Sequence, residues 1–188
     1  MAPLQGRGIS LSQAFRRVVG PFPVAGEATW SNDWHAARCN PEPHLHKGID
    51  IFAPAGTPLV ATRNGVVTQK GIGAVSGLHV EITGHKGIQY FYAHLSRFPP
   101  GLTLGQRVSR GDVVGFVGTT GNARGTSPHV HLEVQPGGVP VPPKPFVDRW
   151  IARAELEATR WVRSVLSRPT TPEEEPAAKA SGPAQPRW

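Results

Sequence analysis

The sequence predicts a mostly β fold built from packed antiparallel sheets. Short apolar runs follow one another at regular spacing, and many of the 22 glycines and 20 prolines lie between them. No helical pattern interrupts these runs in the first three quarters of the chain. Regularly spaced short strands with turn residues between them and no crossover helices are typical of antiparallel architectures. At 188 residues, a single domain is the default expectation.

Seven segments carry the strand signal, because each is short and rich in β-branched or aromatic residues. Side chains two residues apart in a strand share one face of the sheet, so each segment presents one face to the core and one to the surroundings. The predicted strands are residues 48–52, 59–62, 66–70, 78–83, 89–94, 113–117 and 129–135. Together they define a domain over residues 22–135, preceded by an N-terminal extension over residues 1–21.

The chain changes character after residue 135. Residues 136–145 contain five prolines, which exclude a central strand or a helix and predict a linker. Residues 146–167 then show apolar residues at helical spacing opposite a row of arginines, which predicts an amphipathic helix. Such a helix either docks on the domain or meets a partner or membrane surface. Residues 168–188 are dominated by Pro, Glu, Ala and Ser, and we expect this tail to be disordered.

Charge and targeting signals narrow the possible partners. The net charge is +7, and the first 135 residues hold 12 basic against 7 acidic side chains. A basic surface suits an anionic partner such as a bacterial wall. We expect no nucleic-acid partner, because the basic residues are scattered and no nucleic-acid motif is present. No transmembrane stretch is visible, and residues 1–20 lack an apolar run of signal-peptide length. Cys39 is the single cysteine, so no intrachain disulfide forms.

Three short motifs carry the chemistry: His46-Lys47-Gly48-Ile49-Asp50, Tyr92-Ala93-His94-Leu95 and His129-Val130-His131. His129 and His131 are two apart in a predicted strand, so both imidazoles point to one face. Residues 46 and 50 are four apart, and the turn-like 53–56 favours entry into a strand, where they again share a face. A carboxylate and several imidazoles are what a hydrolytic zinc site needs: three ligands, an open position for water and spare bases.

Several neighbouring residues allow more than one interpretation. Alone, a His-x-His pair is usually two surface histidines, and only the conjunction of the three motifs favours a metal site. His44 could compete with His46 as a ligand, but we interpret it as a residue at the groove edge. Strict alternation places Tyr90, Tyr92 and His94 on one side of their strand. Tyr92 is then either a group that hydrogen-bonds a bound peptide or a purely structural strand tyrosine, and both interpretations stay open.

The ordered set of motifs from about residue 22 to residue 134 resembles the lysostaphin-type (LytM-like) zinc endopeptidases that cut peptidoglycan. The resemblance implies a two-sheet antiparallel β domain with a groove that holds one zinc ion per chain. Carried over position by position, it implies that His46, Asp50 and His131 are zinc ligands and that His94 and His129 are catalytic. The segments that carry it are 22–24, 46–51, 53–58, 64–67, 92–95, 113–118 and 120–131.

The resemblance implies a zinc endopeptidase that hydrolyses peptide cross-links of peptidoglycan. A rival hypothesis is a catalytically inactive relative that binds wall or activates another hydrolase; such relatives have typically lost ligands, whereas all five residues are present here. We expect the direct D-alanyl-linked cross-link as substrate, since nothing resembles the wall-targeting domain that is common in cutters of glycine bridges. The substrate further implies extracytoplasmic action, and we expect a monomer.

Overall fold

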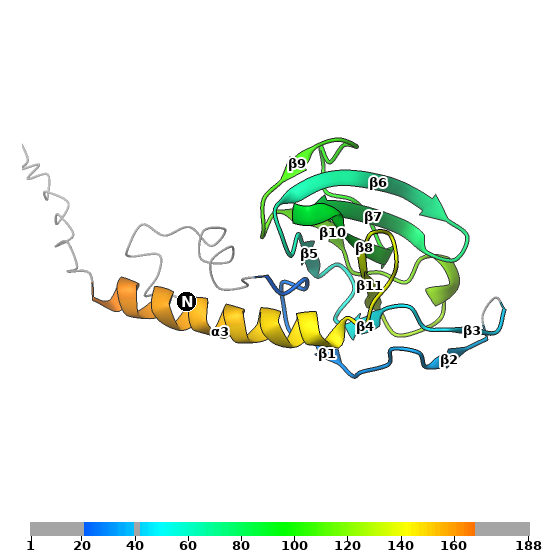
Figure 1. Ribbon diagram of the computed structural model, residues 1–188, viewed down its shortest axis with the longest axis horizontal. Helices are drawn as coiled ribbons and strands as arrows, with labels where there is room; N and C mark the ends of the chain where they lie inside the picture. The colour runs from blue at the N-terminus through cyan, green and yellow to red at the C-terminus, as the bar shows by residue number, and fades with distance from the viewer. Residues whose placement is uncertain (1–20, 40–41, 168–188) are drawn as a thin grey trace, which may run out of the picture.

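The structure is a computed structural model that describes residues 21–39 and 42–167. Figure 1 shows a compact β domain from which one long helix projects along one side. The predicted tail over residues 168–188 lies outside the described residues, as does nearly all of the predicted N-terminal extension over residues 1–21.

A seven-stranded antiparallel sheet forms the body of the domain. Its neighbouring strands are all antiparallel, and the central ones are the longest. In spatial order they are β1 (Thr29–Trp30), β4 (Ile49–Phe52), β11 (His129–Pro136), β8 (Ile88–Leu95), β7 (Gly77–Gly84), β6 (Gly65–Gly73) and β9 (Arg107–Val108).

Two small sheets complete the fold. β5 (Pro58–Val60) pairs with β10 (Val113–Phe116), and β2 (Ala37–Arg38) pairs with β3 (His44–Leu45). Two 3₁₀ turns, η1 (His85–Gly87) and η2 (Gly121–Ala123), lie in the loops. The mostly β, antiparallel fold class predicted from the sequence is confirmed, and all seven predicted strands are present. The two-residue strands β1, β2, β3 and β9 were not predicted, because two residues are too few to show an alternating pattern.

The core lies between the large sheet and the β5–β10 sheet. The period of two along each strand decides which side chains enter it: Ile49 and Ile51 are fully buried, while Asp50 between them points to the opposite face. The same alternation buries Val130 and Leu132 of β11. The other core residues of the sheets include Leu59, Ala61, Val67, Val80, Ile82, Tyr90, Tyr92, Val114 and Val134.

Helix α3 (Lys144–Leu166) begins two residues before the predicted start. In its first two turns Val147 and Trp150 are buried, and the Trp150 ring centroid lies 6.1 Å from that of Tyr90 in β8. Two turns after Trp150, Glu157 pairs with Arg110 at 3.1 Å. Farther along, the helix extends beyond the sheets (Figure 1), and Val162 is exposed. No helix in the described part of the chain is long and apolar enough to span a membrane.

Candidate metal centre

The order of the strands brings the three sequence motifs together. β11 lies between β4 and β8, and its register places His131 directly opposite Asp50 on one side and opposite Ala93 on the other. His94 is the next residue after Ala93. Residues far apart in the sequence therefore meet on the outer face of the sheet, away from the core.

His46, Asp50 and His131 point at one another with three potential ligand atoms. His46 Nε2 lies 3.1 Å from Asp50 Oδ1 and 2.8 Å from His131 Nδ1, and the third side of the triangle, Asp50 Oδ1 to His131 Nδ1, measures 3.1 Å. Within the described residues, these three form a cluster whose ligand atoms all lie within 4.8 Å of one another. Two imidazoles and a carboxylate are a donor set that zinc accepts, with space for a fourth ligand.

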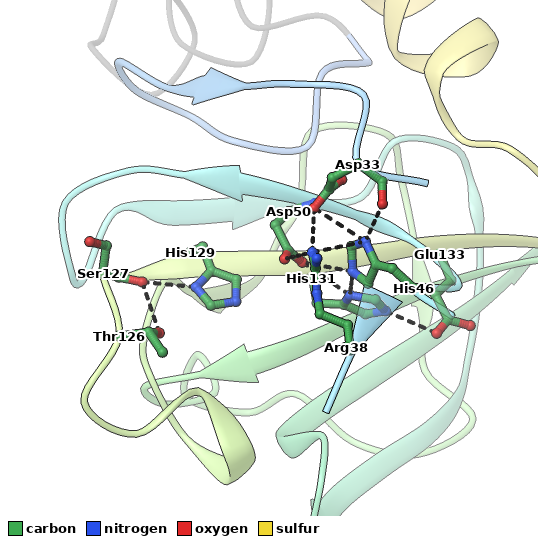
Figure 2. A network of polar contacts seen from close by, with 9 residues as sticks. All are labelled: Asp33, Arg38, His46, Asp50, Thr126, Ser127, His129, His131 and Glu133. Carbon is green, nitrogen blue, oxygen red and sulfur yellow. Dashed lines mark hydrogen bonds and ion pairs between the residues drawn. The ribbon is translucent and has the colours of Figure 1, made fainter. Parts of the chain in front are cut away.

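Two acceptors fix the tautomers of the two histidines (Figure 2). His46 Nδ1 donates to the backbone oxygen of Asp33 at 3.0 Å, and His131 Nε2 donates to Glu133 Oε1 at 2.9 Å. A carbonyl or carboxylate oxygen can only accept, so these two ring nitrogens carry the protons. The lone pairs of His46 Nε2 and His131 Nδ1 then face the centre of the triangle, as metal binding requires.

The electrostatics of the cluster favour positive charge at its centre. Burial lowers the pKa of His46, but hydrogen bonds and charge from Asp33 and Asp50 outweigh it and raise that pKa to about 9. Burial also opposes the protonation of His131, but Asp50 and Glu133 raise its pKa. Burial would raise the pKa of Asp50, but the two histidines hold it far below its usual range. The carboxylates that stabilise a proton on these histidines would equally stabilise a metal cation at the centre of the cluster.

His94 and His129 flank the cluster without belonging to it. Their ring centroids are 5.0 Å apart in an edge-to-face arrangement, and that of His94 lies 5.9 Å from that of His131. His94 Nδ1 donates to the Thr120 backbone oxygen at 2.9 Å, and His129 Nδ1 donates to that of Ser127 at 2.8 Å. In the neutral rings Nε2 is therefore the acceptor nitrogen. Burial, and then the charges of His131 and His129, lower the pKa of His94 to about 4.

A β-bulge in β8 turns His94 toward the cluster. Leu95 pairs with Leu78 and Tyr92 pairs with Val80, so β8 contains one more residue than β7 over this stretch. His94 lies in the bulge and has a φ of +63°. The extra residue reverses the alternation of faces. The prediction that Tyr92 shares a face with His94 is therefore wrong: Tyr92 is fully buried, and its hydroxyl donates to the Val60 oxygen at 3.2 Å. The structural interpretation of this tyrosine is the correct one.

The cluster forms the floor of a groove of 530 Å³. The β2–β3 ribbon forms one wall, where His44 lies at the edge as expected, and η2 lies on the other side. Gly48 is needed beneath this floor, because a Cβ atom there would lie 2.5 Å from His131 Cε1 and 2.6 Å from the Leu132 oxygen. Other lining residues are Ala37, Arg38, Leu45, Lys47, Val75, Ser76, Phe91, Thr126 and Glu133.

Three polar residues around the cluster were missed by the sequence analysis. Glu133 could have been found, because it is two residues after His131 in one strand and so shares its face. Asp33 and Arg38 gave no local signal. They reach the cluster only because the β2–β3 ribbon folds back over His46, whose backbone N–H donates to the Ala36 oxygen at 3.0 Å.

The sequence matches Peptidase family M23 over residues 44–143, more than half of the chain. The chain therefore belongs to peptidase family M23, the family of the LytM-like and lysostaphin-type peptidases.

Particular relatives cover parts of the chain. DD-carboxypeptidase/endopeptidase Mpg of Neisseria meningitidis serogroup B is 46% identical over 99 residues, which are 53% of this chain and 22% of Mpg. Peptidoglycan DD-endopeptidase ShyA of Vibrio cholerae is 34% identical over 137 residues, 71% of this chain and 30% of ShyA. The catalytic domain of the prophage-encoded M23 protein EnpA of Enterococcus faecalis shares the fold with a TM-score of 0.54 and 32% identity, covering 65% of this chain and 95% of that domain. The chain spans less than a third of the length of Mpg or ShyA.

Proposed function

We propose that this protein is a zinc-dependent endopeptidase that hydrolyses peptide cross-links of bacterial peptidoglycan. The observation that carries the proposal is the triangle of His46 Nε2, Asp50 Oδ1 and His131 Nδ1 on the floor of a groove, with two further histidines beside it. We assign these three residues as the ligands of one zinc ion per chain. The names of the relatives, among them a peptidoglycan DD-endopeptidase, support the substrate class.

The residues divide the work between metal binding and proton transfer. A bound zinc ion supplies a Lewis acid that polarises the scissile carbonyl and lowers the pKa of water. His94 and His129 are assigned as the catalytic histidines, because each ring is oriented by a backbone carbonyl and presents its Nε2 to the groove. One accepts the proton of the attacking water at Nε2 and passes it to the leaving amine, while the other, in its protonated form, donates from Nε2 to the oxyanion. The lowered pKa of His94 keeps it neutral at pH 7, as a base must be.

The finer assignments follow from this function. We infer that the direct D-alanyl-linked cross-link is the substrate, which the names of Mpg and ShyA support. Action outside the cytoplasm follows from a peptidoglycan substrate. We also propose that the protein is a monomer, divided into a peptidase domain over residues 22–135, a linker and a C-terminal helix that docks through Trp150.

The ligand assignment is tested by zinc content. Purified protein should hold one zinc ion per chain, whereas Asp50→Ala and His131→Ala should each lose it together with activity, because each removes one of three protein ligands. His44→Ala is the matched control, since this histidine lines the same groove but lies outside the triangle. Full zinc retention in Asp50→Ala or His131→Ala would overturn the assignment.

The substrate assignment is tested on walls. Digestion of purified walls with direct cross-links and with glycine bridges, followed by mass spectrometry of the muropeptides, should show cleavage of the direct type. A zinc-loaded protein that cleaves neither wall would instead support the wall-binding hypothesis.

A further inference from the structure

The segment over residues 33–38 lies outside the part of the chain that matches the family, yet it contacts two of the three proposed ligands. It is fixed over the site by two backbone hydrogen bonds, from His35 N–H to the His46 oxygen at 2.9 Å and from His46 N–H to the Ala36 oxygen at 3.0 Å. Its side chains therefore have defined positions relative to His46.

Asp33 lies behind His46 and Asp50. Its backbone oxygen accepts from His46 Nδ1, and its Oδ2 atom lies 3.2 Å from the same nitrogen. Its other carboxylate oxygen, Oδ1, accepts from the backbone N–H of Asp50 at 3.4 Å. A carboxylate behind a ligand histidine fixes the tautomer and the ring orientation and makes the imidazole a stronger donor.

Arg38 bridges this carboxylate to the ligand Asp50. Its Nη2 atom donates to Asp33 Oδ2 at 2.7 Å and to Asp50 Oδ2 at 3.1 Å. The two oxygens of Asp50 thus have different partners: Oδ1 faces His46 and His131, while Oδ2 is held by the guanidinium. This leaves a single oxygen of Asp50 directed at the centre of the cluster.

We propose that Asp33 and Arg38 are positioning residues for the metal centre, in which Asp33 orients His46 and Arg38 restricts Asp50 to one ligand oxygen. This inference rests on the zinc site proposed above. It assigns to the segment before the matched region a role in setting the affinity and coordination number of the metal.

Metal binding itself provides the test, without any need for wall cleavage. Zinc affinity is measured by competition with a chromogenic chelator for wild type, Asp33→Ala and Asp33→Asn. Loss of an outer-shell partner of a ligand typically costs 10–100-fold in metal affinity, and we expect a loss of about this size in Asp33→Ala. Asp33→Asn should lose less, because its amide oxygen still accepts from the backbone N–H of Asp50.

The coordination number is read from the visible spectrum of the Co²⁺-substituted protein. In Arg38→Met, Asp50 Oδ2 is released and can join the metal, so the d–d bands should weaken and shift as the coordination number rises. Arg38→Lys keeps the charge and should fall between this variant and wild type, because a single ammonium replaces the bridging guanidinium. Arg110→Met is the matched control: Arg110 is 35% exposed against 33% for Arg38, and it pairs with Glu157 far from the site.

Each outcome decides between the possibilities. Wild-type protein that binds neither metal would refute the proposed zinc site itself. The positioning role would be overturned if wild-type protein binds zinc and cobalt but the Asp33 and Arg38 variants match Arg110→Met in metal affinity and spectrum. The segment over residues 33–38 would then serve only as a structural wall of the groove. Melting temperatures identify any variant that fails to fold, in which case Asp33→Asn and Arg38→Lys decide.

Discussion

His94 and His129 are the residues to which we assign proton transfer, separate from the proposed metal ligands. Each is anchored through Nδ1 to a backbone carbonyl, and neither belongs to the triangle of ligand atoms. Replacing either with Ala should keep zinc near one per chain while the turnover rate falls, by about 10²–10⁴-fold for acid–base help and about 10²–10³-fold for an oxyanion donor. The measurement is zinc content beside kcat on a purified muropeptide.

The double variant adds a second readout to this prediction. The two effects should combine to much less than their product, because both residues serve one proton-transfer sequence. His85→Ala, in an exposed turn, is the control. A His129→Ala protein that loses its zinc would show that the roles within the His129–His131 pair are exchanged.

The raised pKa of His46 predicts a pH-dependent zinc affinity. In the metal-free protein this pKa is about 9, so at pH 7 zinc must displace a proton. Apparent affinity should therefore rise by about tenfold per pH unit between pH 7 and 9 for each proton displaced, and level off above. Chelator competition across this range measures it, and a flat profile would mean that His46 is already neutral without metal.

The same shift predicts how the stability of the metal-free protein depends on pH. The pKa of His46 is 6.5 in the unfolded chain and about 9 in the folded protein, so the folded state binds this proton more tightly. The resulting contribution to the free energy of unfolding is fully present below pH 6.5 and is lost as the pH rises through about 9. Denaturant unfolding with a chelator present should therefore show a lower free energy of unfolding at pH 9.5 than at pH 6. Zinc should abolish this difference, because the metal replaces the proton.

At the scale of elements, the approach of β4 to β11 depends on Gly48. A Cβ atom at this position would contact the His131 ring and the Leu132 backbone at less than 3 Å, and the backbone cannot move aside cheaply. Gly48→Ala should therefore cost about 1–3 kcal/mol of stability, as overpacking does, and should weaken zinc binding by displacing His131. Gly71→Ala is the control, since its nearest neighbours would lie at 3.7 Å. Equal zinc affinity in both variants would contradict this account.

At the scale of the whole molecule, helix α3 tests how far the core extends beyond the sheets. Trp150 is 1% exposed and contacts Tyr90, so Trp150→Ala should cost about 3–5 kcal/mol. Trp161 lies farther along the helix and is only half-buried, so Trp161→Ala should lower the free energy of unfolding much less than Trp150→Ala. Thermal denaturation measures both.

Truncations extend this test to the full helix. Ending the chain after residue 169 should preserve the melting temperature, and ending it after residue 145 should lower it. Equal melting temperatures for the two truncations would mean that the helix does not contribute to the core and is available to a partner.

The sequence by itself determined the fold class and identified the five histidine and aspartate residues of the candidate site. Period-two alternation identified the long strands, and the motifs around His46, His94 and His129 named the five residues that the structure places together. Neither inference needs long-range information, because alternation and motif spacing are local properties. The sequence analysis gave Gly48 no packing role, and its fit beneath His131 emerged from the packing of β4 against β11.

Only the tertiary structure decided which face His94 occupies and which residues contact the proposed ligands. The bulge in β8 arises from pairing with β7, so strict alternation placed His94 beside Tyr92, which is in fact buried. Asp33 and Arg38 reach the cluster through the fold of the β2–β3 ribbon over His46. Such contacts depend on where distant segments meet in space, and side-chain pattern along one strand carries no information about them.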